Sequence, residues 1–468
     1  MTATKVLICD LIGLRFDDSG RPDFSEAKAH VEKLGGAFHD GPLGDATALE
    51  SGRIHFFYQP DLSTREELLA AAGDGQYDAV IAAATFLPQE TVFRLGGVRI
   101  GAGTGNMGSA SWGGGSGAGG TSPLMNTPGI NSRATAQMAM KALLKVRPDL
   151  PVNELHTLVA NGNFDTGKQL RDFPTEKLEG KRLAVIGYGN IGREVAKLGR
   201  AFSMRVVIHA RDRHRDWIEG EGFDYAPTLA AAARGADVLS VHVGLGAFDE
   251  AARRYANAGL IGADVLQALN PGAVLINYDR GELVDVPALW KALSSGRVAH
   301  AAIDADLFKD PVTGALSGPM LPYLALVEEY GDRLELLPHA AADTDHPSRV
   351  TGAKQAIDQI FAVVRDKRVH NLKGTLPDGY IDGGAQVPAG IGTVTSGSII
   401  AIASDGDVAG KLSRYADDFA GFWRNIESVS SPDERARLAR DHGREMVVAA
   451  NGLAKLLRQL GLDAPYEQ

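Results

Sequence analysis

The sequence predicts an α/β protein whose parallel sheets are covered by helices on both faces. Short apolar runs such as KVLICD, RIHFFY and YDAVIAAA alternate with helical patterns such as SEAKAHVEKLGG and TREELLAAAGDG. A second alternating series begins at Gly180 and ends near Pro338. Because strands that alternate with helices pair in parallel through helical crossovers, both series predict doubly wound sheets.

The composition limits the classes of partner that we expect. The chain has 468 residues, enough for two or three domains, and a formal net charge of −10. A negative chain disfavours non-specific binding to nucleic acid, which depends on a basic surface. The sequence shows neither a signal segment nor a run of about 18 apolar residues, so we expect a soluble, cytoplasmic protein without a membrane partner. The single cysteine, Cys9, excludes an internal disulfide framework and a multi-cysteine metal site, and we predict no bound metal.

Two segments interrupt the alternation. Residues 105–123 (GNMGSASWGGGSGAGGTSP) are rich in glycine and serine, which do not favour a single conformation. They predict either a mobile surface loop or a flap or subunit contact near a ligand. From about residue 374 the sequence is linker-like. Beyond it, apolar residues at helical spacing predict a helical hairpin or a small helical cap, namely Leu412, Tyr415, Phe419, Phe422 and Ile426.

A glycine-rich turn opens the second series. In KRLAVIGYGNIGREVAKLGRAF, Gly187, Gly189 and Gly192 follow an apolar strand and begin a helix. The first glycine permits a tight turn, the second lets a pyrophosphate approach the backbone, and the third lets helix and strand pack closely. The pyrophosphate would bind the N–H groups at the helix N-terminus. The turn predicts a dinucleotide site at residues Gly187, Tyr188, Gly189, Asn190, Ile191 and Gly192.

The next strand bears on the choice of cofactor. The residue at its end, roughly 20 positions after the loop, usually carries an acid that binds the ribose 2′-hydroxyl. Here, in VIHARDRHRD, that residue is Ala210, and Arg211 follows it. An arginine attracts a 2′-phosphate, so this pattern favours NADP(H). If the strand runs two residues longer, Asp212 becomes the ribose acid and the cofactor is NAD(H). The third alternative is a solvated turn without a role.

Three later motifs place polar side chains at strand ends, where open α/β sheets bind ligands. Arg280 follows the apolar run AVLIN, His339 follows LELL, and the run VAHAAIDADLFKDP carries Asp304, Asp306 and Asp310. Reduction of a 2-oxo acid needs an arginine for the substrate carboxylate, a histidine that exchanges a proton, and a carboxylate that orients the imidazole. The sequence therefore predicts a catalytic site for this chemistry.

These residues resemble the D-isomer-specific 2-hydroxyacid dehydrogenase family. The resemblance covers about residues 1–371 and rests on NTPGINSRATAQ, GYGNIGREVAKLGRAF, LSVHV, LNPGAVLINYDRGELVDVPAL, AAIDADLFKDP and LLPHAA. It implies two Rossmann-like domains with a cleft between them, hydride transfer between a nicotinamide and C2 of a 2-oxo or D-2-hydroxy acid, and a homodimer. We assign residues 1–129, completed by 339–371, to a substrate domain, residues 130–338 to the dinucleotide-binding domain, and residues 372–468 to a linker and helical extension.

The resemblance also implies roles for single residues. Arg280 matches the substrate arginine of the family, and His339 matches its acid/base. Asp304 matches the aspartate near the nicotinamide amide. The backbone at Ala102, Gly103 and Thr104, together with Asn131, matches the substrate-facing loop and helix start, where N–H groups could hold a carboxylate.

The chain departs from the family pattern at several positions. The family glutamate before a proline is replaced by Asp310, one residue displaced, and we expect Asp310 to support His339. Asp279 adds a negative charge before Arg280, and Gly244 and Gln137 replace a proline and a glutamate. The segment AAATFLPQE stands where phosphoglycerate-type members carry arginines, so a phosphorylated substrate is not expected.

Three functions are consistent with these observations. The first is an NAD(P)-dependent reductase of a small, non-phosphorylated 2-oxo acid. The second is a cofactor-sensing protein that keeps the fold and the dinucleotide site but uses its tail and its glycine-rich loop for contacts with other proteins. The altered residues Asp279, Asp310 and Gln137 motivate the second hypothesis, and the arginine–histidine pair argues against it. The third is an oxidoreductase whose oxo acid substrate carries a second anionic group, an alternative that the negative charge of Asp279 disfavours.

Overall fold

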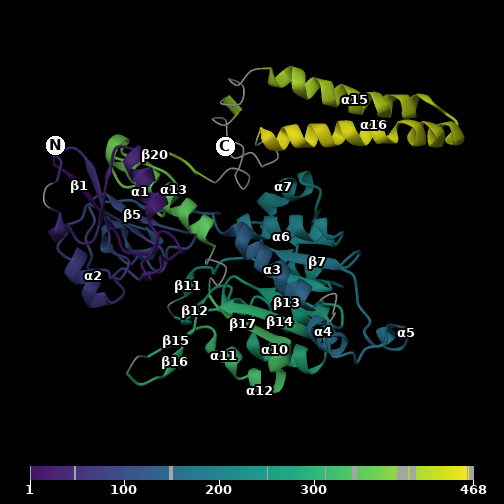
Figure 1. The fold of residues 1–468 in the computed structure, drawn as a ribbon, viewed down its shortest axis with the longest axis horizontal. Helices are drawn as coiled ribbons and strands as arrows, with labels where there is room; N and C mark the ends of the chain where they lie inside the picture. Colours follow the sequence, from purple (N-terminus) through teal and green to yellow (C-terminus); the bar gives the residue numbers. More distant parts are fainter. Residues whose placement is uncertain are drawn as a thin grey trace. The chain divides into compact units, whose positions relative to one another are not determined.

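The computed structural model describes residues 2–46, 49–146, 151–249, 251–310, 312–339, 345–386, 399–400, 407–460 and 462. The chain divides into two compact units, Met1–Gly384 and Ala385–Gln468 (Figure 1). The first unit contains two seven-stranded sheets, and the second contains a pair of long helices. Among the described residues, no helix is both long enough and apolar enough to cross a membrane.

The first sheet has the strand order β19-β6-β5-β4-β1-β3-β2. Its strands are β1 (Thr4–Ile8), β2 (Ala37–Asp40), β3 (Ile54–Tyr58), β4 (Ala79–Ala82), β5 (Gly96–Arg99), β6 (Leu124–Asn126) and β19 (Leu372–Lys373). All neighbours are parallel except β19, which is antiparallel to β6. Successive residues of β1 point to opposite faces: Val6 packs toward α1 (Ser25–Lys33) and α13 (His346–Asp366), and Leu7 packs toward α2 (Arg65–Ala72). Covered faces on both sides explain why these strands are apolar throughout.

The second sheet is wholly parallel, with the order β17-β14-β13-β10-β7-β8-β9. Its strands are β7 (Arg182–Ile186), β8 (Arg205–His209), β9 (Asp224–Tyr225), β10 (Val238–Val241), β13 (Ala273–Asn277), β14 (Val298–Ala305) and β17 (Leu334–Pro338). Helices α3 (Ser132–Val146), α6 (Asn190–Ala201) and α7 (Arg215–Gly220) cover one face, and α8 (Leu229–Ala233), α9 (Ala263–Ala268) and α10 (Val286–Ser294) cover the other. The strand order reverses between β7 and β10, the point where such sheets bind ligands. Two doubly wound parallel sheets confirm the predicted fold class.

Smaller elements connect these layers. Two short hairpins pair β11 (Phe248–Asp249) with β12 (Arg254–Tyr255) and β15 (Phe308–Lys309) with β16 (Leu316–Ser317), and β18 (Arg368–Val369) pairs in parallel with β20 (Ile381–Asp382). The remaining helices of the first unit are α4 (Val152–Ala160), α5 (Thr166–Gln169), α11 (Leu321–Leu324) and α12 (Val327–Tyr330).

The glycine-rich segment 105–123 is folded around a tryptophan. Trp112 is fully buried beneath the first sheet with Met107, and its indole N–H donates to the Met107 carbonyl at 2.9 Å. Two 3₁₀ turns, Ala110–Trp112 and Gly114–Ser116, form this coil. The expectation of a surface loop is therefore wrong for the centre of the segment, because a large buried indole anchors the surrounding glycines.

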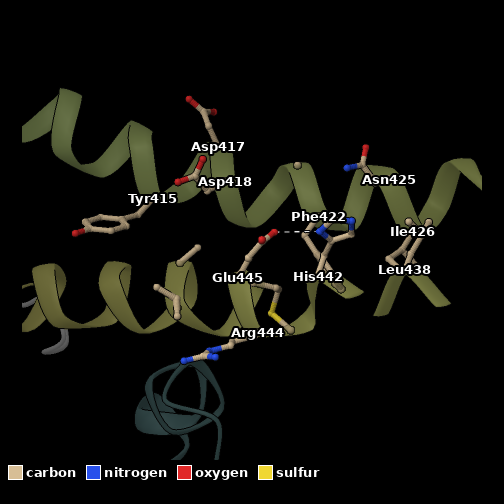
Figure 2. A pocket seen from close by; sticks show the side chains of 14 residues that line it. Tyr415, Asp417, Asp418, Phe422, Asn425, Ile426, Leu438, His442, Arg444 and Glu445 are labelled. Carbon is tan, nitrogen blue, oxygen red and sulfur yellow. Dashed lines mark hydrogen bonds and ion pairs between the residues drawn. The ribbon is translucent and has the colours of Figure 1, made fainter. Parts of the chain in front are cut away.

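The second unit is a helical hairpin formed by α15 (Val408–Ser428) and α16 (Pro432–Gln459). Both helices begin at side-chain caps, Asp407 and Ser431, which accept hydrogen bonds from backbone N–H groups three residues on. The helices pack closely where Gly452 faces the Tyr415 ring. A hollow of about 610 Å³ lies along the hairpin between apolar and charged side chains, including Phe422, Glu445 and His442, with His442 bound to Glu445 (Figure 2). The hairpin confirms the helical extension expected from the spacing of apolar residues.

Candidate active site

The glycine turn between β7 and α6 has the predicted shape. Gly187 has φ +98°, and a Cβ there would lie 2.1 Å from the His242 carbonyl oxygen. A Cβ on Gly192 would lie 2.0 Å from the Gly187 carbonyl oxygen, so this residue lets helix and strand approach each other. Gly189 precedes the first residue of α6, and a Cβ there would meet no atom within 4 Å. The open space at Gly189 and the following helix N-terminus, formed with Asn190 and Ile191, fit a bound pyrophosphate.

Two alanine substitutions separate the structural role of the turn from its binding role. Gly187→Ala should lower the free energy of unfolding by about 1–3 kcal/mol or more, because the residue would combine a positive φ with a backbone clash. Gly189→Ala should leave the thermal midpoint unchanged and weaken NADPH binding, because its methyl group would occupy the space of the pyrophosphate. Thermal unfolding and cofactor titration of both variants test this. Tight cofactor binding by Gly189→Ala would contradict the assignment.

Tyr188 can contribute only its backbone to this turn. Its side chain is buried, and its hydroxyl donates to the Glu221 carboxylate. The centroid of its ring lies 5.1 Å from the centroid of the Trp217 ring. Arg193 binds the same carboxylate through its Nε at 2.8 Å. Burial, and then the contact with Glu221, raises the pKa of the Tyr188 phenol. This buried network connects the turn to α6 and the helix that follows β8.

The strand that follows the glycine turn leads into the charged turn that bears on the choice of cofactor. β8 ends at His209, so Ala210 is the residue after the strand, and Asp212 begins a 3₁₀ turn, Asp212–His214. Both Arg211 and Asp212 are exposed. Arg215, by contrast, is engaged, because its Nε binds Glu219 at 3.0 Å. Arg211 is thus the cation of this turn that lies next to the strand end.

A cavity of about 330 Å³ lies at the carboxyl ends of the strands of the second sheet. The substrate-facing residues predicted from the sequence, Ala102, Gly103, Asn131 and Arg280, line it. The other lining residues are Arg99, Thr135, Met138, Ile191, Gly244, Tyr278, Asp279, Asp304, Leu337 and His339. Thr104 has a different role: its hydroxyl donates to the Gly115 carbonyl at 2.6 Å within the glycine-rich segment. The cavity therefore combines a loop of the first sheet with three strand ends of the second.

The charged side chains at the centre of this cavity come from three neighbouring strands or the residues just after them. Arg280 follows β13, Asp304 lies on β14, and His339 follows β17. The Nε2 atom of His339 contacts an Nη atom of Arg280, and its Nδ1 atom lies 2.6 Å from a carboxylate oxygen of Asp304. Asp304 is only 5% exposed. A carboxylate on Nδ1 fixes the tautomer and leaves Nε2, on the Arg280 side of the ring, as the atom that exchanges the reacting proton.

The carboxylate predicted to support His339 was the wrong one. Asp310 lies at the exposed tip of the β15–β16 hairpin, where one of its oxygens accepts hydrogen bonds from the Val312 N–H, the Thr313 N–H at 2.6 Å and the Thr313 hydroxyl. These hydrogen bonds, those of Thr313 first, lower the pKa of the Asp310 carboxyl. Aspartate commonly stabilises a turn in this way. Asp304, predicted for the nicotinamide amide, supplies the carboxylate instead.

Arg99 and Tyr278 line the cavity but were not predicted from the sequence as ligand-facing groups, whereas Asp279 was expected to add a negative charge near the carboxylate site. Arg99 is the last residue of β5, and Tyr278 and Asp279 directly precede Arg280. The Tyr278 hydroxyl donates to Glu335 at 2.5 Å, which fixes the ring. Burial raises the pKa of the Asp279 carboxyl, while Arg280 and His339 act in the opposite direction. The rule that polar residues at strand ends face ligands could have identified Arg99.

Comparison with known proteins places this site in a family. The NAD binding domain of the D-isomer specific 2-hydroxyacid dehydrogenases matches residues 150–314. A glyoxylate reductase from Aeropyrum pernix is 33% identical over 250 residues, which span 53% of this chain and 68% of that protein. A D-3-phosphoglycerate dehydrogenase from Archaeoglobus fulgidus is 31% identical over 224 residues, 47% of this chain and 37% of that protein.

Solved structures share the fold at lower identity. A glyoxylate reductase from Paecilomyes thermophila superposes with a TM-score of 0.52 at 22% identity, covering 80% of this chain and 98% of that one. A D-isomer specific 2-hydroxyacid dehydrogenase from Polaromonas gives 0.53 at 21% identity, covering 81% and 100%. The fold and the dinucleotide turn define a nicotinamide-dependent oxidoreductase. The chain belongs to the D-isomer specific 2-hydroxyacid dehydrogenase family.

Proposed function

We propose that the protein reduces a small, non-phosphorylated 2-oxo acid to the D-2-hydroxy acid and prefers NADP(H). The contact between Arg280 and His339, with Asp304 on the far side of the imidazole, is the observation that carries the proposal. Arg280 and His339 border one cavity beside the dinucleotide turn, so one small substrate can contact both side chains. The names of the relatives, which include glyoxylate reductases, agree with this chemistry.

Each side chain has a defined task in this scheme. Arg280 binds the substrate carboxylate through charge-assisted hydrogen bonds and polarises the 2-oxo group. The turn at Gly187, Gly189 and Gly192 would hold a reduced nicotinamide cofactor, which would supply the hydride for C2. His339 donates the proton from Nε2 to the oxygen on C2, and Asp304 stabilises the imidazolium form that carries this proton. The backbone at Ala102 and Gly103 closes the other side of the substrate, where Gly103 lies close to the Arg280 guanidinium.

Asp304 also bears on the alternative hypothesis of a cofactor sensor. That hypothesis drew on the loss of the usual glutamate, yet Asp304 gives His339 a carboxylate partner. A panel of 2-oxo acids without any NADPH oxidation, together with tight NADPH binding, would favour the sensor. A cytoplasmic location, a homodimer and the domain boundaries inferred from the sequence stay predictions.

The relative affinity for NADPH and NADH tests whether the turn after β8 binds the 2′-phosphate. We expect NADPH to bind at least roughly tenfold tighter than NADH, because Arg211 would form charge-assisted hydrogen bonds with the 2′-phosphate. Arg211→Gln should remove this preference, whereas Arg215→Gln should keep it, since Arg215 is bound to Glu219. Fluorescence titration of both cofactors measures the ratio. Tighter NADH binding that is lost in Asp212→Asn would assign the ribose to Asp212 and contradict the preference.

A further inference from the structure

The cavity contains a second arginine that the proposed chemistry does not use. Arg280 from the second sheet is sufficient for the carboxylate next to the 2-oxo group. Arg99, from the end of β5 in the first sheet, lines the same cavity and is half-buried. A guanidinium presents a rigid fork of donors that matches a carboxylate.

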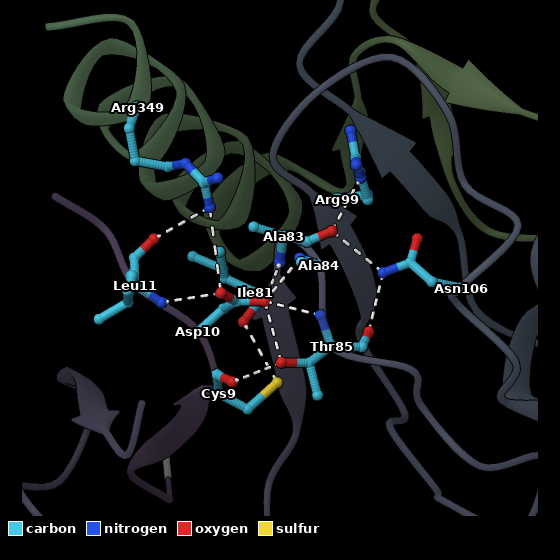
Figure 3. Close-up of polar contacts among 10 residues, drawn as sticks. All are labelled: Cys9, Asp10, Leu11, Ile81, Ala83, Ala84, Thr85, Arg99, Asn106 and Arg349. Atoms are coloured by element: carbon cyan, nitrogen blue, oxygen red, sulfur yellow. Dashed lines mark hydrogen bonds and ion pairs between the residues drawn. The ribbon is translucent and has the colours of Figure 1, made fainter. Parts of the chain in front are cut away.

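The Arg99 side chain is held in a defined position. Its Nε donates to the Ala83 carbonyl at 2.9 Å, and Asn106 donates to the same oxygen at 3.0 Å (Figure 3). Gly101, with φ +114°, leaves room for the guanidinium, because a Cβ there would lie 1.8 Å from Arg99 Nη1. A side chain at position 101, just before the substrate-facing loop, would therefore displace the Arg99 guanidinium.

The anchor of Arg99 is itself rigid. One carboxylate oxygen of Asp10 accepts hydrogen bonds from the N–H groups of residues 83–85, at 3.0, 2.6 and 2.8 Å, and from the Thr85 hydroxyl (Figure 3). Arg349 of α13 approaches the other oxygen at 3.9 Å. This cluster joins the ends of β1 and β4, where the strand order of the first sheet reverses. A guanidinium fixed in this way loses little conformational entropy on binding a ligand.

We propose that Arg99 binds a second carboxylate of the substrate, so that the preferred substrates are 2-oxo dicarboxylic acids. The inference rests on the proposed function, because it takes Arg280 as the partner of the first carboxylate. Asp279 and Asp304 also border the cavity, where Asp304 binds His339 and Asp279 is adjacent to Arg280. Arg99 is the arginine that the first sheet contributes to this cavity, and Arg280 is the arginine that the second sheet contributes.

Binding of product analogues tests the inference without turnover. With NADPH bound, a D-2-hydroxy acid cannot react, so its affinity can be titrated through NADPH fluorescence on the full-length protein. We expect D-malate to bind at least about tenfold tighter than D-lactate, the effect of one charge-assisted hydrogen-bonded pair. Arg99→Gln should bring this ratio to about one and leave D-lactate binding unchanged. The matched variant Arg171→Gln, at an exposed arginine in the turn after α5, should keep the wild-type ratio.

The possible outcomes separate this inference from the proposed function. Equal binding of D-malate and D-lactate, or an unchanged ratio in Arg99→Gln, overturns the role of Arg99 and leaves the reductase proposal intact. D-3-phosphoglycerate could instead bind more tightly than D-malate in the wild type and lose this advantage in Arg99→Gln. Arg99 would then bind a phosphate rather than a carboxylate, and the proposed substrate class would be wrong. Selective D-malate binding without turnover of any 2-oxo acid supports Arg99 and contradicts the reductase. Arg99→Lys, which keeps the charge but not the fork, should give an intermediate ratio if Arg99→Gln fails to fold.

Discussion

Replacing His339 by glutamine should lower the turnover of a 2-oxo acid by about 10²–10⁴-fold, the usual contribution of a positioned general acid. Glutamine is close in size to histidine and can donate a hydrogen bond, but it cannot transfer a proton. The affinity for NADPH should stay within about twofold of the wild-type value, because the dinucleotide turn lies on other strands. The measurements are the steady-state rate of NADPH oxidation and a cofactor titration.

An outcome in which both quantities fall together would contradict this role. It would show that His339 supports the structure of the cleft rather than the chemistry. The thermal midpoint of the variant distinguishes these cases, because His339 is partly exposed and its replacement should not unfold the protein.

The second large effect is expected at Asp304, with Asp310 as its matched control. Asp304→Asn should lower kcat on the order of 10²-fold, because the amide no longer compensates the positive charge on the imidazole. Asp310→Asn is the same substitution at an exposed turn and should leave kcat unchanged.

The thermal midpoint distinguishes a positioning role from a structural role for Asp304. A structural defect would lower the thermal midpoint together with the rate. If Asp310→Asn lowered the rate and Asp304→Asn did not, the carboxylate inferred from the sequence would be the working one, and the contact between Asp304 and His339 would have no part in catalysis.

The parts of the site that depend on local backbone constraints could be predicted from the sequence. The glycine turn is one example, because the positive φ of Gly187 and the close packing at Gly192 are requirements of a single strand–turn–helix unit. Arg280 and His339 were also predicted, because each comes shortly after an apolar strand. Their contact agrees with the prediction that both serve one substrate.

The partner of His339 could not be predicted, because it depends on the register between strands. Asp304 of β14 pairs with Leu337 of β17, two residues before His339, and this register brings the carboxylate to the imidazole. Asp310 is closer in sequence to the expected position of the family glutamate. It directly follows β15 of the short β15–β16 hairpin, however, and is exposed at the surface. The strand-end rule could have drawn attention to Arg99, but the sequence does not show that the end of β5 borders the same cavity as the strand ends of the second sheet.

The central claim is that His339 and Asp304 act as one unit on a substrate held by Arg280. The most direct measurement is the single-turnover rate of NADPH oxidation with a 2-oxo acid in the wild type, His339→Gln, Asp304→Asn and the double variant. Residues that act as a unit are strongly non-additive, so the double variant should be no slower than His339→Gln alone, within about threefold. A double variant whose loss equals the product of the two single losses would show that Asp304 acts independently of His339 and would contradict the claim.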